Sequence, residues 1–158
     1  MDQKNRLNWF YRKILGTPLD LDNFDQKLIV QKIVYIAQQM GVQFDYGFGW
    51  WVRGVYSSPL TVDLYNINKH ELTYVPTRFE KLLAEKLLNI AGAFKNQVRA
   101  FEIVSTVVYA QEHRGMTDEK KISEFIKSAK PWFTDEEIEV AFKKTGELRN
   151  LKMNNTTC

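Results

Sequence analysis

Residues 24–40 repeat apolar side chains at steps of three and four positions along the chain. The repeating residues are Ile29, Ile33, Ile36, Ala37 and Met40. This spacing lines one side of an α-helix, so it predicts an amphipathic helix whose apolar stripe packs against a core. Asp22 or Asn23 can cap its N-terminus, and Gly41 stands where a left-handed residue ends many helices.

A second helix is predicted over residues 95–114, and its composition indicates where it lies. It is crowded with apolar and β-branched residues: Phe101, Ile103, Val104, Val107 and Val108. β-Branched residues are poor helix formers on their own. Because burial on several sides is needed to stabilise such a helix, we expect it at the centre of the fold.

Further helices follow from capping and breaking signals. They are predicted over 5–15, from Ser58 to about His70, from the Thr77–Glu80 capping box to about Gly92, from Thr117 or Asp118 to Pro131, and onward from the Thr134–Glu137 capping box.

The segment 42–55 has a different pattern, in which aromatic residues alternate with glycine and aspartate. Period two predicts a strand or hairpin, and a second short strand is predicted over 71–75. The fold class that follows is mainly α, a compact domain of six or seven helices with a small β-hairpin near 42–56 and 71–76. We expect a single domain over 1–152 and a flexible tail over 153–158.

Length and composition set the class of protein. The 158 residues are typical of one domain, and 44% hydrophobic with 26% charged residues excludes a disordered chain. No apolar run of about 18 residues and no apolar leader occurs, so we expect neither a membrane partner nor secretion. With Cys158 as the one cysteine, no disulfide can form within the chain, which favours a cytoplasmic location.

Residues that usually carry catalysis are sparse. His70 and His113 stand far apart without the spacing of a zinc site, and Cys158 lies in the predicted tail. No phosphate-binding glycine loop or nucleophile elbow occurs. The sequence therefore predicts a protein that is not an enzyme and needs no metal or cofactor.

The segment Tyr46–Ser58 is rich in the side chains that dominate binding interfaces. It holds five aromatic residues, one arginine and three glycines, and Trp, Tyr and Arg are the residues most enriched at binding hot spots. Strand alternation places Trp50 and Trp51 on opposite faces, so one can fill the core while the other stays outside. We expect at least one of Trp51, Arg53 and Tyr56 to be exposed and to bind a partner.

Nucleic acid is an alternative partner. The net charge of +3 is small, but residues 1–15 alone account for it. Four residues there interleave basic and aromatic side chains, as in nucleic-acid-binding arms: Arg6, Trp9, Arg12 and Lys13. Helices followed by a small hairpin can also form a winged helix, so the alternative is a nucleic-acid-binding domain of the kind found in mobile elements or viruses, with DNA or RNA left open.

Several short motifs resemble the Panacea family, also called the SocA-like antitoxin domain. Gln31–Gln38 (QKIVYIAQ) is similar to its "QKLLYLA" helix, Trp51–Ser58 to its aromatic strand and "yGPyS" turn, and Lys130–Glu137 (KPWFTDEE) to its "KPxFS-x-E-E" segment. The matched order spans about residues 24–145. Val55 stands where the relatives carry the turn proline.

The resemblance implies a helical, non-enzymatic binder with a small β-element. Such domains neutralise toxins or deliver them to a protease as adaptors, and they often travel on mobile elements. Together with Trp51, the positions carried over are the candidate partner-binding residues: Lys32, Tyr35, Arg53, Gly54, Tyr56 and Ser57. The oligomeric state stays open, with a homodimer as one option.

Overall fold

The structure, a computed structural model, describes residues 3–67 and 73–156. Over these ranges it has seven helices and one two-stranded antiparallel sheet, which confirms the predicted mainly α class. The elements in chain order are α1 (Gln3–Leu15), α2 (Phe24–Gln39), β1 (Gly49–Trp51), β2 (Gly54–Tyr56), α3 (Ser58–Tyr65), α4 (Arg78–Gly92), α5 (Gln97–Glu112), α6 (Glu119–Ala129) and α7 (Asp135–Thr156).

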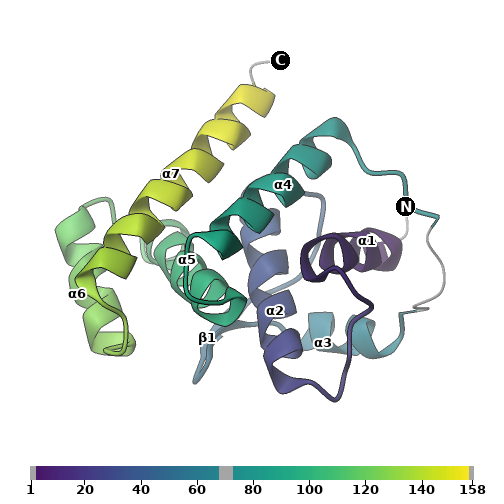
Figure 1. Cartoon of the computed structure of the whole chain (residues 1–158), viewed down its shortest axis with the longest axis horizontal. Coiled ribbons are helices and arrows are strands. Elements are labelled where there is room, and N and C mark those ends of the chain that lie inside the picture. The colour runs from purple at the N-terminus through teal and green to yellow at the C-terminus, as the bar shows by residue number, and fades with distance from the viewer. Residues whose placement is uncertain (1–2, 68–72, 157–158) are drawn as a thin grey trace.

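Helix α5 lies at the centre, as its β-branched residues predict (Figure 1). It packs against α2, α4, α6, α7 and the hairpin, while α1 lies against α2 and α4. Nine of its sixteen residues are buried, including Ser105 and Thr106. Burial on several sides offsets the weak helix propensity of the sequence.

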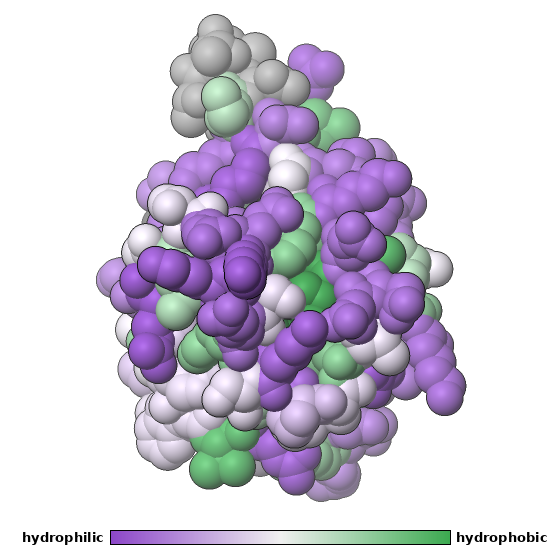
Figure 2. All heavy atoms as spheres, turned by 90° about the vertical axis from the view of Figure 1, so that its left-hand side faces the viewer, coloured by the Kyte–Doolittle hydropathy of each residue, from purple (hydrophilic) through white to green (hydrophobic). Residues whose placement is uncertain are grey.

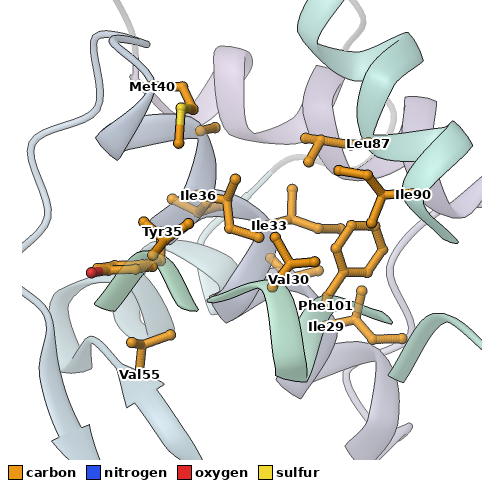
Figure 3. Close-up of a cluster of buried hydrophobic side chains, with 14 of the residues drawn as sticks. Ile29, Val30, Ile33, Tyr35, Ile36, Met40, Val55, Leu87, Ile90 and Phe101 are labelled. Carbon is orange, nitrogen blue, oxygen red and sulfur yellow. The ribbon is translucent and has the colours of Figure 1, made fainter. Parts of the chain in front are cut away.

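The core forms where the apolar stripe of α2 meets α4 and α5. Figure 3 shows side chains of α2, such as Ile33, lying against Phe101 of α5 and Leu87 of α4. Val55 reaches the same cluster from β2, next to Tyr35. Val55 of β2 therefore lies within the core, and Trp50 of β1 packs against it.

A buried ion pair ties α1 to α4. The Nε of Arg6 donates to Glu80 Oε2 at 3.0 Å and lies 3.0 Å from the Tyr74 hydroxyl, while its Nη1 donates to the carbonyl of Gln43. Glu80 also accepts from the Tyr74 hydroxyl at 2.6 Å and from the backbone N–H of Thr77, which closes the predicted capping box.

The β-structure is smaller than predicted. Residues 42–48 form no strand, and within them a helix side chain bonds to the backbone of Tyr46: Gln38 accepts from the N–H of Tyr46 at 3.0 Å and donates to its carbonyl at 2.8 Å. Residues 73–76 are also not a strand, and 71–72 lie outside the described residues. Because 42–48 is not a strand, residues 73–76 have no strand in that segment to pair with.

Two helix ends also differ from the prediction. Helix α3 ends at Tyr65, earlier than residue 70, which is itself outside the described residues. Helix α7 continues to Thr156, so residues 153–156 extend the last helix where we expected a tail. Within the described ranges, none of the helices combines the length and apolar character that a membrane span requires.

Candidate functional site

The hairpin is built around a tight turn. Gly49 pairs with Tyr56, Trp50 with Val55 and Trp51 with Gly54. Gly54 has a φ of +99°, in the left-handed region, and no non-glycine residue of the described chain has a positive φ. This pattern is typical of a type I turn at Val52–Arg53 followed by a glycine bulge.

The two tryptophans lie on opposite sides of β1, as the alternation predicts. The Trp50 ring stacks on Tyr109 of α5 at 4.6 Å between centroids and contacts Phe125 of α6. Trp51 points away from the core: 57% of it is exposed, and its ring lies 5.0 Å from that of Tyr56. Trp51 therefore has the exposure that a partner contact needs.

Arg53 joins the hairpin to the N-terminus of α2. Its guanidinium lies 5.3 Å from the centroid of the Phe24 ring, within the range of a cation–π contact. Phe24 is 53% exposed although it is a large apolar side chain. The hairpin and the start of α2 thus form one continuous aromatic surface.

A small pocket lies beside this surface, between α2 and α3. It measures about 180 Å³, and Tyr65, 56% exposed, stands on its rim. The full lining is Leu21, Phe24, Lys27, Leu28, Gln31, Tyr56, Thr61, Leu64 and Tyr65. We call this pocket together with Trp51 and Arg53 the hairpin groove.

Polar contacts hold the groove in shape. Gln31 accepts from the N–H of Ser57 at 2.9 Å and donates to its carbonyl, and the Ser57 side chain caps α3 by accepting from the N–H of Leu60. The Thr61 hydroxyl donates to the Tyr56 hydroxyl at 2.8 Å. These bonds fix the direction of Tyr56 relative to α3.

The predicted partner-binding residues separate into two groups. Trp51, Arg53 and Tyr56 line the groove, whereas the remaining four are buried and face the protein interior: Lys32, Tyr35, Gly54 and Ser57. The Tyr35 hydroxyl lies 2.7 Å from Nδ1 of His113, and burial raises the pKa of Tyr35. Because these four residues are buried, a partner cannot contact them in this structure.

The four residues of the predicted nucleic-acid arm do not form one exposed patch. Arg6 is buried in the ion pair with Glu80. Trp9 is half-buried and packs against Phe10 and Tyr74, Arg12 is half-buried, and Lys13 is exposed. This arrangement disfavours α1 as a phosphate-binding surface.

Sequence reasoning missed Phe24 and Tyr65 as surface aromatics, and it did not single out Lys130 or Glu102. An aromatic residue directly after the Asn23 cap is a usable signal for Phe24, because the first turn of a helix is often exposed. Lys130 begins a motif that the resemblance used and Glu102 lies in the predicted helix over 95–114, but nothing in their spacing shows that the folded chain brings them together.

A cluster of cationic groups lies under the hairpin turn. Lys32 Nζ donates to the carbonyl of Arg53 at 2.7 Å, and Lys130 Nζ bonds to Glu102 Oε2 at 2.9 Å. The Lys130 ammonium also lies 5.5 Å from the rings of both Trp50 and Trp132. Burial and then the neighbouring Lys130 lower the pKa of Lys32 to about 8.

A wider hollow of about 640 Å³ lies near the start of α5 and α7. Three of the charged side chains that line it, Arg99, Glu102 and Glu137, form ion pairs. Arg99 donates to both carboxylate oxygens of Glu137, and this pairing lowers the pKa of Glu137 to about 2. Figure 2 shows the face that carries α6, where hydrophobic atoms form a narrow central strip and smaller patches among mainly hydrophilic side chains.

A metal site is not formed by the described residues, in which no group of three or more His, Cys, Asp or Glu side chains gathers. Comparison with known proteins finds no protein-family model, no curated protein and no solved structure that matches this chain. The resemblance to the Panacea family therefore stays a prediction.

Proposed function

We propose that this chain is a protein-interaction module that binds a partner protein through the hairpin groove and carries out no catalysis. The observation that supports this most is that half-exposed Phe24 and Tyr65 line one small apolar pocket, and that exposed Trp51 packs on Tyr56, which also lines it. Large aromatic residues beside a pocket, with an arginine at the edge, are typical of binding hot spots.

The size of the pocket favours a protein over a small molecule. Small-molecule sites usually measure about 300–1,000 Å³, whereas this pocket measures about 180 Å³. It has room for one apolar anchor side chain of a partner, with the exposed aromatics packing around it.

The charge at the groove indicates the character of the partner. Lys27 is the one charged residue that lines the pocket, and the exposed Arg53 lies next to Phe24. A segment with an apolar anchor and a flanking carboxylate fits both features, since opposite charges across an interface set orientation and partner choice. A toxin or the target of a proteolytic adaptor, as the Panacea resemblance implies, is the narrower form of this proposal.

Affinity capture with paired variants tests the proposal. The tagged full chain is incubated with nuclease-treated lysate of the encoding organism and washed at rising salt. We expect one partner protein to stay bound at high salt and to be lost with Trp51→Ala and with Tyr65→Ala. Leu88→Ala, an exposed apolar position on α4 outside the pocket lining, is the control and retains the partner.

Two outcomes would overturn the proposal. Partner retention by both groove variants would show that the groove is not the binding surface. Loss of all bound material with nuclease or moderate salt would favour nucleic acid, because binding led by phosphates weakens steeply as salt rises.

A further inference from the structure

Two lysines are buried side by side beneath the hairpin turn. Only 3% of Lys32 and 2% of Lys130 is exposed. A Cβ built on Gly54 would lie 3.4 Å from Lys32 Nζ and 3.5 Å from Lys130 Nζ, so both nitrogens border the same position. Lysine is almost never fully buried unless it is paired, and here two lysines share one location.

The cluster carries more positive than negative charge. In the described part of the chain, Glu102 is the one carboxylate that forms an ion pair with either lysine, and it bonds to Lys130. Lys32 has the neutral carbonyl of Arg53 as its acceptor. The charge of Arg53 acts on Lys32 as well, so three cations stand against one carboxylate. A buried charge without a counter-ion is costly.

This setting favours the uncharged form of Lys32. Burial and the Lys130 charge are the two largest effects that lower its pKa, to about 8. Near that pH a large fraction of the folded chains holds a neutral amine at this position, and a neutral amine has the lone pair that a nucleophile needs.

Access decides which reagent can reach this amine. The two nitrogens are almost completely covered, so a hydrated anion or a bulky carbonyl compound cannot enter without moving the hairpin. Carbon dioxide is small, apolar and uncharged, so burial does not exclude it. Because residue 54 is a glycine, no side-chain atom of this residue occupies the position that borders both nitrogens.

We propose that Lys32 is a site of reversible carbamylation by carbon dioxide, with Lys130 as the positioning residue that stabilises the product. The amine lone pair forms an N–C bond to the carbon of CO2, and one C=O π pair moves onto oxygen. The nitrogen then releases one proton to solvent. The product is a carbamate anion on Lys32, and no oxidant or reductant is involved.

The neighbours favour this product electrostatically. The reaction replaces a group that is cationic at neutral pH with an anion, so the cluster changes from three cations and one anion to two cations and two anions. The Lys130 ammonium lies on the side of Gly54 that borders Lys32, where it can donate to a carbamate oxygen. Such charge-assisted bonds are among the strong ones in proteins.

Carbamylation also changes what holds the turn. The Lys32 ammonium donates to the Arg53 carbonyl at 2.7 Å, and the carbamate is mainly an acceptor. Carbon dioxide would therefore act on the hairpin that carries Trp51 and Arg53. This inference stands on the buried cluster alone and does not depend on the proposed partner binding.

The test is trapping of the carbamate on the full chain. The protein is equilibrated at pH 8 with ¹³C-bicarbonate, treated with triethyloxonium to convert carbamates into stable ethyl esters, digested and analysed by mass spectrometry. We expect ¹³C label on the peptide containing Lys32, in proportion to dissolved CO2. Lys130→Met should lower the labelled fraction by about tenfold, the factor for one pKa unit, since it removes the stabilising charge and raises the Lys32 pKa.

Matched variants separate the role of Lys130 from general lysine chemistry. Lys130→Arg keeps a positive charge and should keep most of the label. Lys127→Met removes an exposed lysine in the last turn of α6, just before Lys130, and should leave the label unchanged. Circular dichroism checks that each variant folds. If Lys130→Met does not fold, the labelled peptides of the wild-type chain still show whether Lys32 forms a carbamate.

Two results would overturn the proposal. The first is label on the N-terminal amine with none on Lys32, which would show that the reagent worked and that the buried amine did not react. The second is an unchanged labelled fraction in a folded Lys130→Met, which would show that the cluster does not stabilise the carbamate.

Discussion

The molecule buries positive charge in two places, and the two sites are built differently. Arg6 is matched by one carboxylate, one phenol and one carbonyl, all within 3.0 Å. Under the hairpin, two lysines share the single carboxylate of Glu102. The site at Arg6 is complete, whereas the site at Lys32 lacks a counter-charge.

The difference separates two uses of buried charge. A fully bonded ion pair such as Arg6–Glu80 fixes one arrangement of neighbouring elements, here α1, the 42–48 segment and α4. An over-cationic cluster does not gain the same stability and instead shifts the pKa of one of its members. The stabilising pair thus lies between α1 and α4, and the reactive cluster lies between α2 and the hairpin turn.

The largest expected effect is at the complete site. Glu80→Ala leaves Arg6 buried without a counter-ion and removes the Glu80 side-chain bond of the α4 capping box, and breaking a buried pair costs roughly 3–5 kcal/mol. Urea denaturation at pH 7 measures the loss. Glu85→Ala, exposed on the same helix, is the control and should change stability by less than about 0.5 kcal/mol. A cost below about 1 kcal/mol for Glu80→Ala would show that the pair is not structural.

The incomplete site at Lys32 should make the free energy of unfolding depend on pH. Because the pKa of Lys32 is about 8 in the folded chain against 10.5 ordinarily, the unfolded chain holds a proton that the folded chain has released between these values. Stability of the wild type relative to Lys32→Met should therefore rise from pH 8 to 10.5. The rise is on the order of 3 kcal/mol, at about 1.4 kcal/mol per pKa unit.

Denaturation of both chains across this pH range measures that difference, and the titration of shared tyrosines cancels in it. A difference that stays constant from pH 8 to 10.5 would show that Lys32 titrates normally and would contradict the contrast between the two sites.

Gly54 connects the turn to the lysines, and its replacement should have an intermediate effect. Gly54→Ala places a side chain at φ +99° and 3.4 Å from Lys32 Nζ, and left-handed backbone costs a non-glycine residue about 1–2 kcal/mol. Thermal unfolding gives the value. Gly47→Ala meets no atom within 4 Å and has no left-handed φ, so it should be nearly neutral. Equal stability of the two variants would show that a side chain at position 54 does not strain the backbone.

The smallest expected effect on stability is at the exposed side of the hairpin. Trp51→Ala removes a side chain that is more than half exposed and packs mainly on Tyr56, so unfolding should shift by less than about 0.5 kcal/mol. Trp50→Ala, which removes the ring stacked on Tyr109, should cost several times more. Similar losses for both would mean that Trp51 is a core residue in solution.

The sequence predicts what depends on neighbouring residues along the chain. Asn23 and the capping boxes at Thr77 and Thr134 lie where expected, and the Trp50–Trp51 alternation gives one inner and one outer face. The missed features depend on contacts that form only when the chain folds. Gln38 bonds to the backbone of Tyr46 where the pattern predicts a strand, and the Lys130–Glu102 pair joins residues 28 positions apart.

The measurement that tests the central claim most directly is the affinity of the captured partner protein for the full chain at low and high salt. The proposed function predicts a Kd that changes little with salt and weakens at least tenfold in both Trp51→Ala and Tyr65→Ala, with Leu88→Ala unchanged. A Kd that is equal in all four proteins would contradict binding through the hairpin groove.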